Sequence, residues 1–308
     1  MTTVYLGTSA FAAAVLRRLA AGPHRPLLVV TRPDRPRGRG RRLASPPVAD
    51  VARELGIDVD QPDSVNSGDS RARLAAAEPD AVLICAFGAL VREPLLSDHP
   101  MLNVHPSLLP RWRGAAPIER AIDAGDPATG VSIMRPTADL DAGPVCLAGR
   151  ESIRLDDDFA SLSARLEELA GELLQRALDE RPEFVEQPEV GVTFADKITA
   201  EDRRLDPERT PDELDRRVRA LTPHVGSHVD HAGERLGVVR ARPAAPPAGT
   251  AAGELAMDGG RLLFGCAGGD LELLEVKPPG GRAMSADAYA RGRRLEPAGD
   301  ATADRDPA

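Results

Sequence analysis

The chain has 308 residues, more than one hydrophobic core usually organises, so its length predicts two domains. Hydrophobic residues make up 42% of it, and no segment approaches the roughly 20 consecutive apolar residues of a membrane helix, which excludes a membrane-spanning protein. The net charge of -9 argues against nucleic-acid binding over the whole surface but permits a local basic patch. The N-terminus does not have the pattern of a signal peptide, and three cysteines cannot form a disulfide framework, so we expect a protein of the reducing cytoplasm.

The first 150 residues alternate short apolar runs with helical patterns. A helical pattern at 11–21 follows the first of the strand-like runs, which lie at residues 4–6, 27–31, 81–87 and 101–104. Because these runs are apolar on both faces, they predict a doubly wound, Rossmann-like α/β domain with a parallel sheet covered by helices. In such folds ligands bind beyond the carboxyl ends of the strands, and we expect the site at that edge.

The second half of the chain has a different pattern. A long helix is predicted from about Asp158 to Asp179, where apolar residues recur every three or four positions. A further helix is predicted at 211–221, and short alternating runs punctuated by Gly and Pro then indicate a small OB-like β-barrel. We therefore expect a first domain over residues 1–188, a linker over 189–201, a barrel domain over 202–296 and a disordered tail over 297–308.

The sharpest motif is LNVHPSLLP, at the end of a predicted strand. Because side chains alternate along a strand, Asn103 and His105 leave the same face, which places an amide beside an imidazole at the carboxyl edge of the sheet. A later loop, TADLDAGP, offers Asp139 and Asp141, either of which could pair with the histidine. On residue types alone, a β-turn with solvated aspartates and a histidine that caps the sheet edge explains the same pattern.

A second motif is the basic stretch RPDRPRGRGRR at residues 32–42, directly after the second predicted strand. It overhangs the same carboxyl edge as Asn103 and His105. Arginine binds phosphates and stacks on bases, so the stretch could face RNA. Taken alone, it is more simply a solvated, flexible basic loop.

Together these motifs resemble the folate-dependent formyltransferase family, whose members share an Asn, a His and an Asp around N10-formyltetrahydrofolate. Within that family the sequence is most similar to the members that act on methionyl-tRNA. The resemblance covers nearly the whole chain. Its motifs are TRPDRPRGRGRRLASPPV, QPDSVN, AFGALV, NVHPSLLPRWRGAAPIERAI and GDPATGVSIM, then ADKITAEDRRLD, VRALTPHVG and KPPGGRAM.

The resemblance implies an enzyme that transfers the formyl group of N10-formyltetrahydrofolate to the α-amino group of methionyl initiator tRNA, for translation initiation. The reaction passes through a tetrahedral intermediate with an oxyanion, which the amide of Asn103 and a protonated His105 would stabilise. Asp141 occupies the family's Leu-Asp-x-Gly position and would hold the charged His105 and relay a proton. Asp139 is the reserve candidate. We expect a monomer.

The resemblance also implies two sets of binding residues. The folate contacts are expected from Phe87, Gly88, Ser107, Leu108, Leu109, Pro110 and Asp139. The tRNA contacts are expected from Arg35, Arg37, Arg39, Arg41, Arg42, Arg113, Lys197, Lys277 and Arg282. Among the latter, Arg42 is the expected reader of the unpaired end of the acceptor stem.

Three other interpretations remain open at this point. A related formyltransferase that acts on a small amine or an amino-sugar nucleotide would keep the same Asn, His and Asp. A non-catalytic RNA-binding protein would use the barrel alone, and a hydrolase would release formate from the same folate. The cysteines have no CxxC spacing and Gly7-Thr8-Ser9 is not GxGxxG, so we expect neither a metal nor a nucleotide cofactor.

Overall fold

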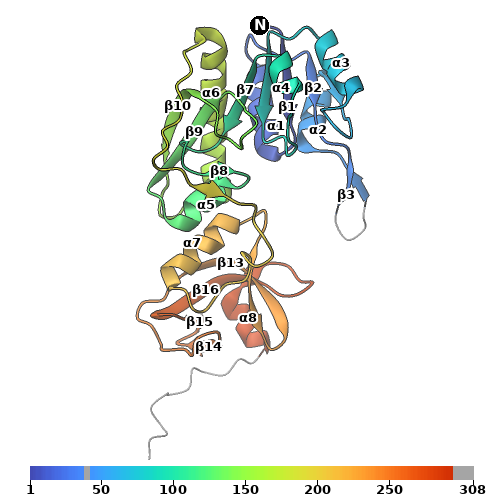
Figure 1. The fold of residues 1–308 in the computed structure, drawn as a ribbon. Coiled ribbons are helices and arrows are strands. Elements are labelled where there is room, and N and C mark those ends of the chain that lie inside the picture. The colour runs from blue at the N-terminus through green and yellow to red at the C-terminus, as the bar shows by residue number, and fades with distance from the viewer. Residues whose placement is uncertain (38–41, 294–308) are drawn as a thin grey trace, which may run out of the picture. The chain divides into compact units, whose positions relative to one another are not determined.

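The computed structural model describes residues 1–37 and 42–293, which form two compact units (Figure 1). The first unit consists of Met1–Pro117, Ala128–Ser152 and Ser163–Ala195, and the second of Ile118–Pro127, Ile153–Leu162 and the described residues from 196 to 293. Each unit has its own hydrophobic core. Among the described helices, none is long and apolar enough to cross a membrane.

The first unit is built on a seven-stranded sheet. Five of its strands are parallel neighbours, and β9 and β10 extend the sheet with antiparallel pairing beside β7. This confirms the predicted doubly wound fold. In sheet order the strands are β10 (Val145–Ser152), β9 (Ala128–Met134), β7 (Met101–His105), β6 (Ala81–Cys85), β1 (Thr3–Gly7), β2 (Leu28–Val30) and β5 (Asp58–Asp60).

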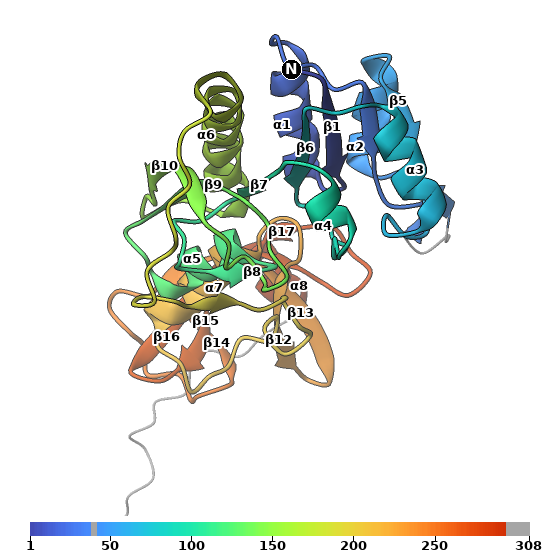
Figure 2. The same cartoon turned by 45° about the horizontal axis from the view of Figure 1, so that its top comes forward.

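Helices cover both faces of this sheet (Figure 2). On one face, alternate residues of β1 pack with Leu74 and Leu95 from two helices. On the other face, the fully buried Tyr5 donates a hydrogen bond to the carbonyl of Ala12 at 2.7 Å, which fixes a helix against β1. The helices of this unit are α1 (Ala10–Ala20), α2 (Pro47–Glu54), α3 (Gly68–Ala76), α4 (Leu95–Asp98) and most of α6 (Phe159–Glu180).

Two short ribbons complete the first unit. The strands β3 (Arg35–Arg37) and β4 (Arg42–Ala44) pair antiparallel, so the flanks of the basic stretch form a strand pair where the sequence indicated a loop. The strands β8 (Arg113–Gly114) and β11 (Phe194–Ala195) pair in parallel. Phe194–Ala195 lies in the segment that we expected to be an irregular linker, and a two-residue strand is too short to leave a periodic pattern.

The second unit contains a six-stranded antiparallel sheet, which has the form of a half-barrel. Its apolar face includes Leu236, Phe264 and Leu273 and packs against the helix at 211–221. Both the predicted helix and the predicted change to a β-rich domain are confirmed. Its elements are α5 (Pro117–Ala124), α7 (Pro211–Leu221), β12 (Ser227–His231), β13 (Glu234–Pro243), β14 (Leu255–Asp258), β15 (Arg261–Cys266), β16 (Gly269–Lys277), β17 (Met284–Ser285) and α8 (Ala286–Arg293).

Local chemistry explains where α7 begins. The Thr210 hydroxyl accepts a hydrogen bond from the backbone N–H of Glu213, and the Glu213 carboxylate accepts one from the backbone N–H of Thr210 at 2.9 Å. This reciprocal capping box satisfies two N–H groups that a helix N-terminus otherwise leaves unpaired. Leu214 and Val218 then place the apolar side of α7 in the core.

A charged cluster within the second unit holds α5 to the chain that precedes α7. Arg120 donates to both carboxylate oxygens of Asp202, at 2.8 and 3.2 Å, and Thr199 donates to the same carboxylate through its backbone N–H and its hydroxyl. The hydrogen bond from Arg120 is the main reason that the pKa of Asp202 lies well below the usual value for aspartate.

We predict that this cluster makes stability depend on acid pH. A carboxyl group whose pKa is lower in the folded protein than in the unfolded chain stabilises the fold. This stabilisation is complete at pH values above the pKa of the unfolded chain, about 4, and is lost as the pH falls towards the pKa of the folded protein. Asp202→Asn should therefore lower the free energy of unfolding by about 1–2 kcal/mol at pH 7, measured by urea denaturation, and by less at pH 3. Asp63→Asn, which removes an exposed carboxylate, is the control, and a constant difference across this pH range would contradict the prediction.

Candidate active site

The fold brings Asn103, His105 and Asp141, hereafter the trio, together at the carboxyl end of β7. Asn103 and His105 leave β7 on one face, and Asp141 lies in the loop that joins β9 to β10. The Asn103 Nδ2 lies 3.4 Å from Asp141 Oδ1, and the His105 Nδ1 lies 3.6 Å from Asp141 Oδ2. A carboxylate, an imidazole and an amide thus meet where a doubly wound fold binds its ligands.

His105 is held between two acceptors. The residue is only 4% exposed, and its Nε2 lies 2.8 Å from the carbonyl oxygen of Trp112. Because a carbonyl can only accept, Nε2 carries a proton, and Nδ1 on the other side of the ring faces the Asp141 carboxylate. A second proton on Nδ1 would create an imidazolium that donates to both neighbours, so this geometry accommodates the charged form.

The structure distinguishes the two aspartates of the loop. Asp141 accepts a hydrogen bond from the backbone N–H of Gly114 at 2.9 Å, and its backbone has a φ of 47°, in the left-handed region that non-glycine residues rarely adopt. Asp139 is exposed, and among the described residues its carboxylate has no partner. Asp141 is therefore the aspartate that contacts the other two members of the trio.

Close backbone packing shapes the loop of residues 135–144, hereafter the Asp141 loop. Its ends are joined by a hydrogen bond from the N–H of Arg135 to the carbonyl of Pro144 at 2.9 Å. A Cβ atom at Gly143 would lie 1.9 Å from the carbonyl oxygen of Arg135, so only glycine fits there. The glycine of the Leu-Asp-x-Gly pattern is therefore required because any side chain at this position would clash with the backbone.

The residues expected to bind folate lie around the same strand ends. The hydroxyl of the fully buried Ser107 donates to the carbonyl of Arg111 at 2.6 Å, and Ser132 of β9 donates to the carbonyl of Ser107. This network fixes the turn that carries the half-buried Leu108, Leu109 and Pro110. Phe87 is different, because its ring is 4% exposed and belongs to the core of the first unit.

Gly88 and Arg113 also have defined roles in the structure. Gly88 has a φ of 73°, and its carbonyl accepts a hydrogen bond from Arg32 at 2.7 Å. Arg113 lies on β8, and its Nε and Nη2 groups donate to Gln187 Oε1 at 3.0 and 2.8 Å. The contacts of these residues with folate and tRNA stay predictions.

The other residues expected to bind tRNA are distributed over both units. Arg35 and Arg42 are exposed on β3 and β4 of the first unit. Arg37 is on β3, whereas Arg39 and Arg41 lie outside the described residues. In the second unit, Lys197 precedes α7, Lys277 ends β16 and Arg282 follows it, and all three are exposed.

The contacts of residues 182–195, hereafter the strap, were not predicted from the sequence. Gln187 Nε2 donates to the carbonyls of Asp141 and Gly143, and Thr193 Oγ1 accepts from the backbone N–H of Trp112. These partners are backbone groups, which every residue has, so the sequence carries no complementary motif that could reveal the contacts. The one amide side chain in this segment without apolar periodicity, Gln187, was the only signal.

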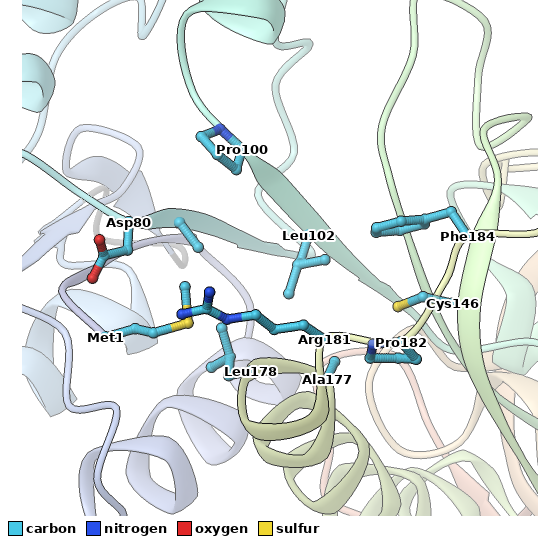
Figure 3. A pocket seen from close by; sticks show the side chains of 11 residues that line it. Met1, Asp80, Pro100, Leu102, Cys146, Ala177, Leu178, Arg181, Pro182 and Phe184 are labelled. Atoms are coloured by element: carbon cyan, nitrogen blue, oxygen red, sulfur yellow. The ribbon is translucent and has the colours of Figure 1, made fainter.

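A cavity of about 260 Å³ lies at the opposite, amino-terminal end of β7 (Figure 3). Its mostly apolar lining includes Leu102, Leu178 and Phe184, and the side chain of Arg181 extends across it towards Met1. No member of the trio lines this cavity. Within the described part of the chain, no group of three His, Cys, Asp or Glu side chains could hold a metal ion.

Comparison with known proteins agrees with this geometry. The family model for formyl transferase matches residues 1–178, and the model for the formyl transferase C-terminal domain matches residues 197–294. The chain belongs to the formyltransferase family. It is 39% identical to the methionyl-tRNA formyltransferase of Neisseria meningitidis serogroup C, over 96% of this chain and 98% of that protein.

Other members support the same assignment. The identity to the methionyl-tRNA formyltransferase of Methylococcus capsulatus is 41%, again over 96% of this formyltransferase chain and 98% of the relative. Among solved structures, the fold is similar to that of an N-formyltransferase from Helicobacter canadensis in complex with folinic acid and dTDP-3-aminofucose. That comparison has a TM-score of 0.64 at 13% identity and covers 89% of this chain and 98% of the other.

Proposed function

We propose that this formyltransferase moves the formyl group of N10-formyltetrahydrofolate to the α-amino group of methionyl initiator tRNA. Full-length similarity to methionyl-tRNA formyltransferases supports the reaction. The observation that carries the mechanism is the convergence of Asn103 and His105 on Asp141 at the strand ends, at distances of 3.4 and 3.6 Å. The product would serve translation initiation, and we infer that the reaction takes place in the cytoplasm.

The chemistry requires stabilisation of negative charge. When the amine attacks the formyl carbon, the formyl oxygen becomes an oxyanion and the attacking nitrogen becomes positive. The Asn103 amide makes only long contacts, 3.4 Å to Asp141 Oδ1 and 3.5 Å to Met134 Sδ, so its hydrogens are available for a stronger acceptor. The Asn103 amide would donate to the oxyanion, and a protonated His105 beside it would stabilise the negative charge through its own positive charge.

The same intermediate must lose one proton and gain another. The attacking nitrogen releases a proton, the folate nitrogen N10 accepts one, and the bond between N10 and the formyl carbon then breaks. The Asp141 carboxylate lies 3.6 Å from His105 Nδ1 and 3.4 Å from Asn103 Nδ2, which suits it to relay the proton and to hold the imidazolium. No covalent enzyme intermediate is needed.

The residues present fit a folate beside the trio. The turn of Ser107 to Pro110 offers a half-buried apolar surface and is fixed by buried hydroxyl hydrogen bonds, so it would bind a flat ring without reorganising. The Helicobacter relative was crystallised with folinic acid, a related folate. We place the pterin between this turn, the backbone of Phe87 and Gly88, and the Asp141 loop.

A second candidate substrate is an amino-sugar nucleotide, because the Helicobacter relative binds dTDP-3-aminofucose. Such a substrate gives no role to the exposed arginines of β3 and β4. In a chain of net charge -9, an arginine-rich strand pair beside the strand ends is a localised surface for phosphates. The identity to methionyl-tRNA formyltransferases also far exceeds that to the sugar enzyme.

We predict that substitutions in the trio lower the rate of formyl transfer far more than substitutions of neighbouring residues do. Asn103→Ala, His105→Ala and Asp141→Asn should each lower kcat for formyl transfer by at least ~10²-fold, the effect of losing an oxyanion donor or the charge that holds it. Quenched-flow measurement with both substrates saturating tests this. Asp139→Asn should lower kcat far less than Asp141→Asn, and Asp63→Asn, at an exposed carboxylate outside the site, is the control that should keep the wild-type rate. An inactive Asp139→Asn with an active Asp141→Asn would reverse the assignment.

We predict that the arginines of the β3–β4 region supply phosphate contacts. Each contact displaces condensed counterions, so replacing Arg35, Arg37, Arg39 and Arg41 together with Ala should weaken methionyl-tRNA binding and flatten its dependence on salt by up to about one unit of logarithmic slope for each arginine. Fluorescence titration at several salt concentrations measures both quantities. Arg150→Ala with Arg176→Ala, two exposed arginines elsewhere in the first unit, is the control.

Arg42 should act differently from its neighbours. If it reads the end of the acceptor stem, Arg42→Ala should reduce the preference for initiator over elongator methionyl-tRNA by about 1–3 kcal/mol, with a smaller change in the salt slope. Comparing kcat/KM on the two tRNAs tests this. Unchanged tRNA kinetics after all five arginine substitutions would exclude this surface from tRNA recognition.

A further inference from the structure

We infer that Gln187 is a positioning residue for formyl transfer, which acts by orienting Asp141 towards His105. The inference rests on the proposed function of the trio and extends it to the strap, which contributes no member of the trio. Its basis is that one side-chain amide fixes the backbone on both sides of Ala142. The Gln187 Nε2 donates to the carbonyl of Asp141 at 2.8 Å and to that of Gly143 at 2.7 Å.

The orientation of the Gln187 amide is determined by its neighbours. Arg113 donates to Oε1 through Nε and Nη2, and arginine has no acceptor, so the oxygen must face the guanidinium. Both amide hydrogens therefore face the two carbonyls of the Asp141 loop. Rotating the amide by 180° would place its oxygen against two carbonyl oxygens, so one orientation is strongly favoured.

These hydrogen bonds form a closed circuit between the strap, β8 and the Asp141 loop. Arg113 binds Gln187, Gln187 binds the backbone of Asp141, and the Asp141 carboxylate accepts the N–H of Gly114, the residue next to Arg113. The backbone of Asp141 has a φ of 47°, a conformation that costs a non-glycine residue free energy and persists only when surrounding contacts impose it. Gln187 supplies such contacts at the residue whose carboxylate faces His105.

The strap also holds the other partner of His105. The His105 Nε2 contacts the carbonyl of Trp112, and the N–H of Trp112 donates to Thr193 Oγ1 at 2.9 Å. Trp112 also has a positive φ, 64°. Two residues of one segment, Gln187 and Thr193, thus fix the groups on both sides of the imidazole, although the polar partners of the ring itself are Trp112 and Asp141.

The substitution Gln187→Glu isolates the proposed role. The glutamate keeps an oxygen for Arg113 but replaces the two N–H donors with an oxygen that repels the carbonyls of Asp141 and Gly143. We expect kcat for formyl transfer to fall by about 10-fold or more, because small displacements of reacting groups have effects of this size. The KM values for folate and for methionyl-tRNA should change by a smaller factor than kcat, since Gln187 acts on both substrates only through Arg113 and the Asp141 loop.

A double-mutant cycle provides the decisive measurement. If Gln187 acts through the Asp141 carboxylate, Gln187→Glu should lower kcat in the wild-type background and have little further effect in an Asp141→Asn background. Equal losses in both backgrounds, an unchanged kcat, or a changed KM for tRNA with a normal kcat would each overturn the inference. Gln175→Glu adds the same charge on α6, away from the strap, and should behave as wild type.

Two further measurements separate a positioning defect from misfolding and from an error in the proposed function. If Gln187→Glu does not fold, as judged by circular dichroism, Gln187→Met removes the same donors without adding charge and takes its place in the cycle. The ¹⁵N chemical shifts of His105 should change in the folded variant even if the wild-type protein formylates no tRNA. Unchanged shifts would overturn the inference, whereas an inactive wild type with changed shifts would contradict only the proposed function.

Discussion

The site depends on one constraint, which is that the buried imidazole of His105 lies between a carbonyl and a carboxylate that both come from outside its own strand. A histidine in this setting can bear a second proton without leaving an unpaired N–H, and its positive charge can then stabilise an oxyanion beside Asn103. The strand ends supply His105 and Asn103. The loops supply Trp112 and Asp141, and the strap binds the backbone of both.

The sheet explains how these distant segments meet. Because β9 runs antiparallel to β7, its last residue pairs with Asn103 at the carboxyl edge, and the Asp141 loop therefore starts beside the trio. The strap lies beside both Trp112 and Asp141 and forms hydrogen bonds with their backbones. Trp112 and Asp141 both have positive φ angles, so strained backbone occurs at both partners of His105.

The sequence predicted the parts of this structure that leave periodic or sharply local signals. The apolar runs at β1, β2, β6 and β7 and the amphipathic helix α7 were predicted within a few residues, because burial requires apolar side chains at fixed spacing. The adjacency of Asn103 and His105 follows from strand geometry. The choice of Asp141 over Asp139 came only from family resemblance, and the structure supplies its physical basis, the N–H of Gly114. Gln187 could not be predicted, because its partners are backbone carbonyls and a guanidinium distant in sequence.

The central claim is that the trio serves formyl transfer to methionyl initiator tRNA, and a competition between substrates tests it most directly. N10-formyltetrahydrofolate labelled with ¹³C in the formyl group would be given to the wild-type protein with equal concentrations of methionyl initiator tRNA and a dTDP-linked amino sugar. Mass spectrometry would then locate the label. The account predicts that the label appears on the methionine α-nitrogen of the tRNA; label on the amino sugar, or in free formate, would contradict it.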